Sequence, residues 1–173
     1  MADRGGDGPE TRRISDIVLS VTDGTALATG AEFFPALVRN LAAALGVPYV
    51  FVAECTDRTK TRVRTLAFWN RDRLSDNVEY DLRGTPCEFV VDGGVTYHPE
   101  LLQSRFPDDH DLVALGAESY LGVPIIGASG EILGHLAILD VRPMPEDAVR
   151  SLLLRTFASR AGMELERLRA SEE

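Results

Sequence analysis

The sequence has few of the residues that mark several large classes of protein. Only two of its 173 residues are cysteine, Cys55 and Cys87, which excludes a disulfide framework and a cysteine cage for zinc or an iron–sulfur cluster. No apolar run approaches the ~20 residues that cross a bilayer. The N-terminal segment MADRGGDGPETRR lacks the apolar centre of a secretory signal. We therefore expect a cytoplasmic protein that does not insert into a membrane.

Positive charge is also scarce, with 18 Lys and Arg against 27 Asp and Glu and a net charge of −9. Such a chain repels a phosphate backbone, and no stripe of Lys or Arg with interleaved aromatic residues offsets the repulsion. We therefore expect neither nucleic acids nor anionic membranes as partners. What the chain does contain, 45 % hydrophobic and 26 % charged residues, is typical of one soluble domain with its own core.

The N-terminal third predicts a tail and two helices. Residues 1–12, rich in Gly and Asp, are expected to be a disordered tail, and 13–170 a single domain. A short first helix is predicted by apolar residues at helical spacing, and it should end at the stretch TDGTALATG. The apolar residues are Ile14, Ile17, Val18 and Val21. Thr29 and Glu32 match a capping box before a second helix, which Gly46 terminates, although Pro35 disturbs its first turn.

The middle of the chain has the pattern of strands. The runs VPYVFVAEC, RVRTLAFWN and NVEYDL, separated by polar turns, predict an antiparallel meander. A short helix at TPCEFVV and a loop rich in Gly, Pro and Asp follow. Residues 116–140 then predict two strands joined by the turn GASG, apolar on both faces, so the sheet should be covered on each side.

The last predicted element is a long helix over residues 145–170. Leu154, Ala158, Ala161, Leu165 and Leu168 have the 4-3-4-3 spacing of a coiled-coil seam, but only for about two heptads. Packing of the helix on its own sheet is the alternative. We expect its first half to pack on the sheet and its second half to join a partner and act as a signalling linker. Because it ends without a glycine cap, we expect a piece of a longer regulator.

The order of these elements predicts an α+β domain with helices on one face of an antiparallel sheet. The segment 84–118, rich in loops, should cover the other face and leave a pocket between sheet and loops. We expect the pocket to be lined by aromatic, hydroxyl, thiol and imidazole side chains: Phe68, Tyr80, Thr85, Cys87, Tyr97, Tyr120 and His135.

Cys87 is the candidate reactive group. Thr85, Pro86 and Glu88 resemble a capping box, which would place the thiol beside free backbone N–H groups and lower its pKa. Such a thiol suits a redox sensor or a ligand contact. The alternative is a small buried side chain whose neighbours happen to cap a helix.

Two other polar groups allow more than one interpretation. His135 and Tyr120 lie within apolar strands, so they either line the pocket or satisfy each other in the core. The sequence PDDHD at 107–111 offers three carboxylates and an imidazole, but it lacks the regular spacing and the glycine of a cation site. We expect a solvated turn there, with Asp111 capping a helix, and we expect no metal site.

The chain resembles a GAF domain, of the kind found at the N-terminal end of bacterial sensor histidine kinases and diguanylate cyclases. The resemblance covers about residues 14–170 and rests on several motifs in the right order: VTDGTALATGAEFF, LAAALGVPYVFVAE, VRTLAFW, YDLRGTPCEFV, FPDD, GAESYLGVPI, LGHLAILDVRPM and RAGMELERLRA. It implies a central six-stranded antiparallel sheet with terminal helices on one face and loops and short helices over the other, as in GAF and PAS folds. It also implies a small-molecule pocket, dimerisation through terminal helices and an attached output domain, a kinase or a cyclase.

The sequence lacks the motifs with which members of this family bind bilins and cyclic nucleotides. The Cys-His pair that attaches bilins is absent, because Cys55 precedes Thr56 and Cys87 precedes Glu88. The Asn-Lys-Phe-Asp-Glu signature of cyclic-nucleotide binding is absent too. Haem would need a pocket histidine, which His98, His110 and His135 leave open without supporting it. The cofactor, if any, is therefore unknown.

The expected function is a non-catalytic sensory domain that binds a small ligand, dimerises, or both, and signals to an output domain. One alternative is a reductase of free methionine sulfoxide that uses Cys87, although the Val-Cys-Gly stretch of such enzymes is absent. Another alternative is a ligand-free dimerisation module.

Overall fold

A computed structural model describes residues 8–172 of the chain. Helix α1, Pro9–Thr25, begins with a proline whose fixed φ angle suits the first helical position. It starts earlier and ends later than predicted, so the predicted disordered tail is wrong for residues 9–12. Burial of Ile17 and Val21 in the core, and a hydrogen bond of 2.8 Å from the Thr25 hydroxyl to the Val21 carbonyl, explain why it continues past TDG. Residues 1–7 of the predicted tail lie outside the described residues.

A short 3₁₀ helix, η1 (Gly30–Glu32), leads into helix α2 (Phe33–Leu45). The predicted capping box is wrong, because the side chain of Thr29 caps neither helix. Pro35 is the third residue of α2, in the first turn, where a missing N–H removes no helical hydrogen bond. Gly46, with a φ angle of 66°, ends the helix as predicted.

The sheet has one long and entirely antiparallel path, in the order β3-β2-β1-β7-β6-β5, with β4 paired to β2. The strands are β1 (Tyr49–Cys55), β2 (Arg62–Asn70), β3 (Arg73–Leu74), β4 (Glu79–Asp81), β5 (Thr96–His98), β6 (Ser119–Ile126) and β7 (Ile132–Asp140). The predicted meander and final hairpin are confirmed. β3 and β5 were not predicted, because two or three residues are too few to show a period of two.

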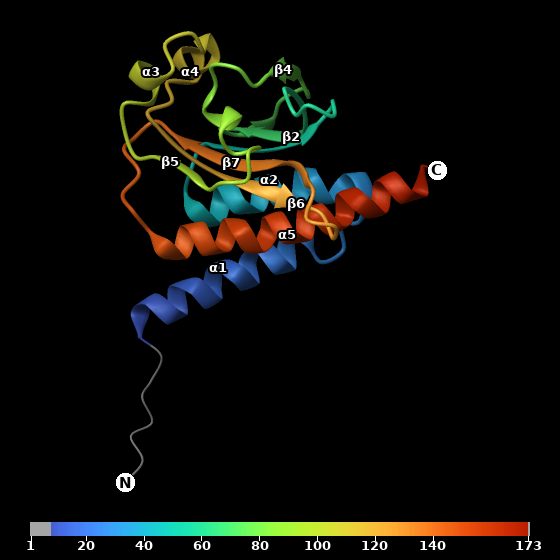
Figure 1. Cartoon of the computed structure of the whole chain (residues 1–173). Helices are drawn as coiled ribbons and strands as arrows, with labels where there is room; N and C mark the ends of the chain where they lie inside the picture. The colour runs from blue at the N-terminus through green and yellow to red at the C-terminus, as the bar shows by residue number, and fades with distance from the viewer. Residues whose placement is uncertain (1–7, 173) are drawn as a thin grey trace.

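The two faces of the sheet carry separate cores. On β1, Val50 and Val52 point toward α1, α2 and α5, whereas Tyr49, Phe51 and Ala53 point toward the loop layer. Figure 1 shows the three long helices on one side of the sheet and the short helices on the other. The predicted fold class, an antiparallel sheet between terminal helices and a layer of loops, is confirmed.

The loop layer contains η2 (Pro86–Glu88), α3 (Leu102–Arg105) and α4 (His110–Leu115). It is fastened to the sheet by the Tyr49 hydroxyl, which donates a hydrogen bond of 2.6 Å to the carbonyl of Leu115. Leu102 and Leu112 are buried beneath it and fill the second core. This layer forms the roof of the pocket.

Helix α5, Ala148–Ser171, begins at Asp147, whose carboxylate accepts hydrogen bonds from the backbone N–H groups of Val149 and Arg150. It packs mainly on β6 (Figure 1). At Gly162 the approach is so close that a Cβ atom would lie 3.0 Å from the carbonyl oxygen of Ile126. Near its end, Arg169 pairs with Glu54 of β1 at 3.1 Å.

The predicted coiled-coil seam on α5 is wrong. Its residues belong to the helix-side core of the domain: Leu154, Ala158, Ala161 and Leu165 are at most 3 % exposed, and the half-buried Leu168 packs against them. The seam and an amphipathic helix have nearly the same spacing, so the pattern alone did not separate them. This stripe of residues packs within its own domain along its whole length, including the second half that was expected to meet a partner.

Among the described residues, none of the helices combines the length and the apolar character needed to span a membrane.

Candidate functional site

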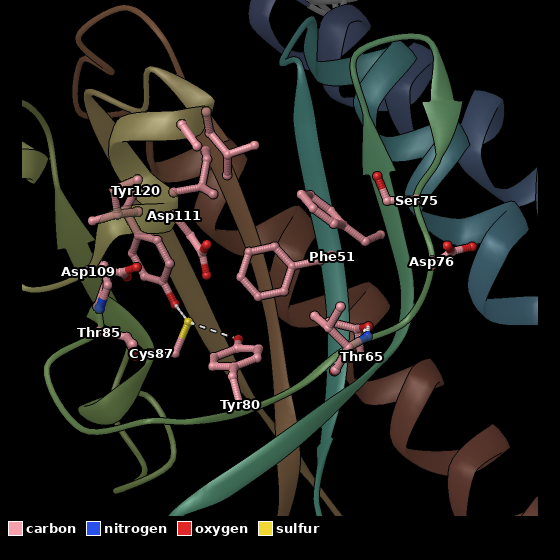
Figure 2. A pocket seen from close by; sticks show the side chains of 17 residues that line it. Phe51, Thr65, Ser75, Asp76, Tyr80, Thr85, Cys87, Asp109, Asp111 and Tyr120 are labelled. Carbon is pink, nitrogen blue, oxygen red and sulfur yellow. Dashed lines mark hydrogen bonds between the residues drawn. The ribbon is translucent and has the colours of Figure 1, made fainter.

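A pocket of about 280 Å³ lies between the sheet and the loop layer. Its floor comes from the sheet, where Phe51, Phe68 and Leu139 project from β1, β2 and β7. Helix α4 and η2 form one wall, and the segment between β3 and β4 forms the opposite one. Figure 2 shows side chains from both walls around a central space. A volume near 300 Å³ is at the lower end of the range for small-molecule sites.

Aromatic rings make up much of the pocket surface. Phe51 and Phe68 meet edge to face, with ring centroids 5.8 Å apart and an interplanar angle of 78°. Tyr80 of β4 and Tyr120 of β6 enter from the side of η2 (Figure 2). Such a surface offers apolar contact and ring faces to a flat ligand.

Cys87 lies at the end of the pocket where the two tyrosines meet. The Tyr120 hydroxyl donates to its sulfur at 3.2 Å and the Tyr80 hydroxyl at 3.7 Å (Figure 2). Burial raises the pKa of the thiol to about 11, although these hydrogen bonds favour the thiolate. At neutral pH the sulfur is therefore a protonated hydrogen-bond acceptor.

Of the two interpretations of Cys87, the low pKa is wrong and the small buried side chain is confirmed, although the capping box assumed in both is wrong. The Thr85 hydroxyl donates to the carbonyl of Leu82 at 2.7 Å and does not cap η2. Glu88 instead accepts a hydrogen bond from the backbone N–H of Gly84. Because η2 is a single 3₁₀ turn, it supplies little field to stabilise a thiolate.

The wall formed by α4 is acidic. Asp109 and Asp111 line the pocket, and the half-buried Asp109 departs from the expected solvated turn at PDDHD, whereas Asp111 is exposed as expected. Asp109, not Asp111, precedes the first helical residue, and its side chain makes no capping hydrogen bond. Burial, followed by the neighbouring carboxylate of Asp111, raises the pKa of Asp109.

The opposite wall is held by hydrogen bonds to β2. The backbone N–H of Val78 donates to the Thr65 hydroxyl at 2.9 Å. The N–H of Ser75 donates to the Phe68 carbonyl, also at 2.9 Å. Ser75 and Asp76 are thereby placed at the rim, across the pocket from α4 (Figure 2).

Two predicted pocket residues lie elsewhere. Tyr97 of β5 packs against the helix-side core, and its hydroxyl donates to the carbonyl of Met144. His135 is on the loop-side face of β7 but does not line the pocket. It is fully buried against Phe51, and within residues 8–172 neither ring nitrogen has a hydrogen-bond partner. Pairing of His135 with Tyr120, one of the predicted alternatives, is therefore wrong.

The structure thus brings five predicted residues together around the pocket: Phe68, Tyr80, Thr85, Cys87 and Tyr120. The sequence prediction missed the acidic side chains at both rims. Their signal was the run of acids itself, which is far more often solvated than part of a pocket. Across the described part of the chain, no three His, Cys, Asp or Glu side chains converge in a way that would hold a metal ion.

A model of the GAF domain family matches residues 30–165. The chain belongs to the GAF domain family. This confirms the resemblance seen in the sequence, and it places the pocket in a family of sensory and regulatory domains that are generally not catalytic.

Solved structures similar to this GAF domain show the same fold. The GAF domain of a phosphoenolpyruvate-protein phosphotransferase from Coxiella burnetii has a TM-score of 0.76 and 17% identity, covering 93% of this chain and 97% of that one. The corresponding domain from Acinetobacter has a TM-score of 0.71 and 14% identity, covering 96% and 99%. The chromophore-binding domain of a bacteriophytochrome from R. palustris has a TM-score of 0.68 and 10% identity, covering 97% and 65%. A search of curated proteins finds no match to the chain.

Proposed function

We propose that this GAF domain is a non-catalytic sensor that binds a small molecule in the pocket between its sheet and its loop layer. The observation that carries the proposal is the pocket itself, about 280 Å³ in volume, with an aromatic floor and convergent polar groups on two walls. One of the similar folds is a chromophore-binding domain, which supports the use of this architecture for ligands.

The strands beneath the pocket offer a route for the signal. Leu139 lines the pocket, whereas its neighbour Ile138 points into the core that holds α5. A ligand that displaces β7 would therefore press on α5 through the sheet, because successive side chains of a strand face opposite sides. We propose that α5 passes this displacement to an output domain, such as a kinase or a cyclase, in a longer chain.

Dimerisation belongs to the same proposal, but the buried stripe of α5 cannot provide it. The large apolar side chains left exposed on the terminal helices are Leu19 of α1, at 58 %, and Leu152 and Met163 of α5, at 58 % and 69 %. We expect Met163→Glu, which places a charge on this exposed surface, to lower the average molar mass measured by light scattering, because fewer chains would be in dimers. An unchanged mass would remove this surface from the proposal.

A reductase dependent on Cys87 is not supported by the geometry. The thiol is buried, and burial also raises the pKa of the second thiol, Cys55. A nucleophile needs its thiolate. We expect Cys87→Ser to leave any reduction of free methionine sulfoxide unchanged from background, and turnover that depends on Cys87 would reverse this assignment.

Native mass spectrometry of the freshly purified protein tests the sensor proposal. We expect a small added mass that is absent under denaturing conditions. Ala114 lines the pocket and Val113, its exposed neighbour on α4, does not. Ala114→Trp should therefore remove the added mass, and Val113→Trp should retain it. A ligand-free protein that also binds nothing in a metabolite panel would favour the dimerisation module instead.

A further inference from the structure

All the charged side chains that line the pocket are acidic. Its lining includes the carboxylates of Asp76, Asp109 and Asp111, and it includes no Lys, Arg or His. None of the three carboxylates takes part in an ion pair within residues 8–172. Some acids elsewhere in the domain do have a basic partner; Glu54, for example, pairs with Arg64 and Arg169. The pocket is therefore a region of uncompensated negative charge.

This charge excludes whole classes of ligand. A nucleotide, or a molecule with free carboxylates, would place its anionic groups near Asp109 and Asp111 with no cation to offset the repulsion. The partial burial of Asp109 strengthens that repulsion, because screening by solvent and salt is weaker there than at an open surface.

The aromatic rings of the pocket also favour a cationic ligand. The faces of aromatic rings carry negative electrostatic potential and attract cations, with Tyr and Phe among the effective partners. Figure 2 shows the side chains of Asp109 and Asp111 on the same side of the pocket as Tyr120, with Asp111 toward the ring of Phe51. A cationic group placed there would meet carboxylates and ring faces together, while Phe68 and Leu139 contact an apolar body.

We propose that the ligand of this pocket is a small organic cation, an ammonium or amidinium group carried on a flat apolar ring system. The inference rests on the proposed sensory function and adds the chemical class of the ligand. The Asp109 and Asp111 carboxylates bind the cationic group, and the rings of Phe51, Phe68 and Tyr80 bind the body. The small volume limits that body to one or two rings.

Three probes of nearly equal shape test this charge preference. Tryptamine is cationic at pH 7, 3-ethylindole is neutral and indole-3-propionate is anionic. Binding is followed by NMR titration of the full chain, using the amide signals of pocket residues such as Thr65 and Ala114. We expect tryptamine to bind about tenfold more tightly than 3-ethylindole, and indole-3-propionate to bind most weakly.

Variants identify the source of the preference. The double variant Asp109→Asn and Asp111→Asn should bring the affinities for tryptamine and 3-ethylindole to within about twofold of each other. Asp108→Asn is the matched control, because Asp108 is an exposed neighbour that does not line the pocket, and it should leave the ratio unchanged.

The outcomes separate the two proposals. Equal binding of the neutral probe, or tighter binding of the anionic one, at the pocket would overturn the cation inference and leave the sensory pocket in place. A charge preference that survives the double variant would also overturn it. If none of the three probes shifts the pocket signals, the cation inference fails, whereas the proposed ligand-binding function is decided separately by native mass spectrometry and the metabolite panel.

Discussion

The imidazole of His135 packs edge-on against the ring of Phe51, with centroids 5.5 Å apart and an interplanar angle of 88°. Phe51 reaches the pocket, and His135 lies behind it, fully buried and without a hydrogen-bond partner in the part of the chain that the structure describes. Because a charged imidazole cannot be solvated there, burial lowers its pKa from 6.5 to about 4. The ring is therefore neutral in the folded protein at physiological pH.

Acid should weaken the fold through His135. In the unfolded chain His135 binds a proton below about pH 6.5, whereas in the folded protein it binds one only below about pH 4. Between these two values the unfolded state binds more protons, so the free energy of unfolding decreases as pH falls. The full contribution is on the order of 3 kcal/mol. Urea unfolding of wild type and His135→Leu between pH 8 and pH 4 measures it. We expect the two free energies of unfolding to diverge as pH falls, in favour of the variant; parallel curves would refute the assignment.

Two neighbouring leucines of α5 test where the helix packs. Leu154 is fully buried in the domain core, whereas Leu152 is 58 % exposed. Leu154→Ala should lower the free energy of unfolding by about 2–5 kcal/mol, and Leu152→Ala by less than about 0.5 kcal/mol. Denaturant unfolding at two protein concentrations provides the measurement. If the cost of Leu154→Ala appeared only at concentrations that support a dimer, the stripe would be an interface after all.

The end of α5 should depend on its pair with β1. Arg169 contacts the buried carboxylate of Glu54 at 3.1 Å, whereas Arg167 pairs with Glu164 within the helix. Arg169→Ala should cost about 1 kcal/mol or less in global stability but should speed amide hydrogen exchange over residues 165–171. Arg167→Ala is the control and should change exchange little. Equal effects of the two variants would show that the link to β1 does not hold the helix end.

Cys87 should be slow to react while the domain is folded. A rise in its pKa from 9.0 to about 11 lowers the thiolate fraction near neutral pH, by a factor on the order of 100. Alkylation by iodoacetamide, followed by mass spectrometry of the Cys87 peptide, should become faster with pH and much faster in urea. Rapid labelling of the folded protein at pH 7.5 would instead restore the redox hypothesis.

The fold could be predicted from the sequence because its signals are local and repeated. β6 and β7 are apolar on both faces, and this indicated a sheet that is covered on each side. The role of α5 could not be decided in the same way. Leu154, Ala158 and Ala161 have a spacing that serves a sheet and a partner helix equally well, and only the arrangement of the whole chain selects between them.

The pocket was predictable where it is built from large side chains. Tyr80 was identified as an aromatic side chain that could form a pocket wall, and Tyr120 as a polar group within an apolar strand. The structure places both against Cys87. Asp109 was missed because a carboxylate in a run of acids is normally solvated. Its position depends on how α4 folds back over the sheet, a long-range relationship that no local pattern records.

The pairing of β1 with β7 sets the order in which this domain is completed during synthesis. β1 is among the first strands made, yet one of its edges stays open until residue 140 has been added, since β7 is its neighbour in the sheet. A nascent chain that stops earlier carries apolar strands with unpaired backbone groups, which invite aggregation. The long-range contact also makes folding slow for its size. Ribosome pausing before β7 is therefore the point at which we expect this chain to need a chaperone most.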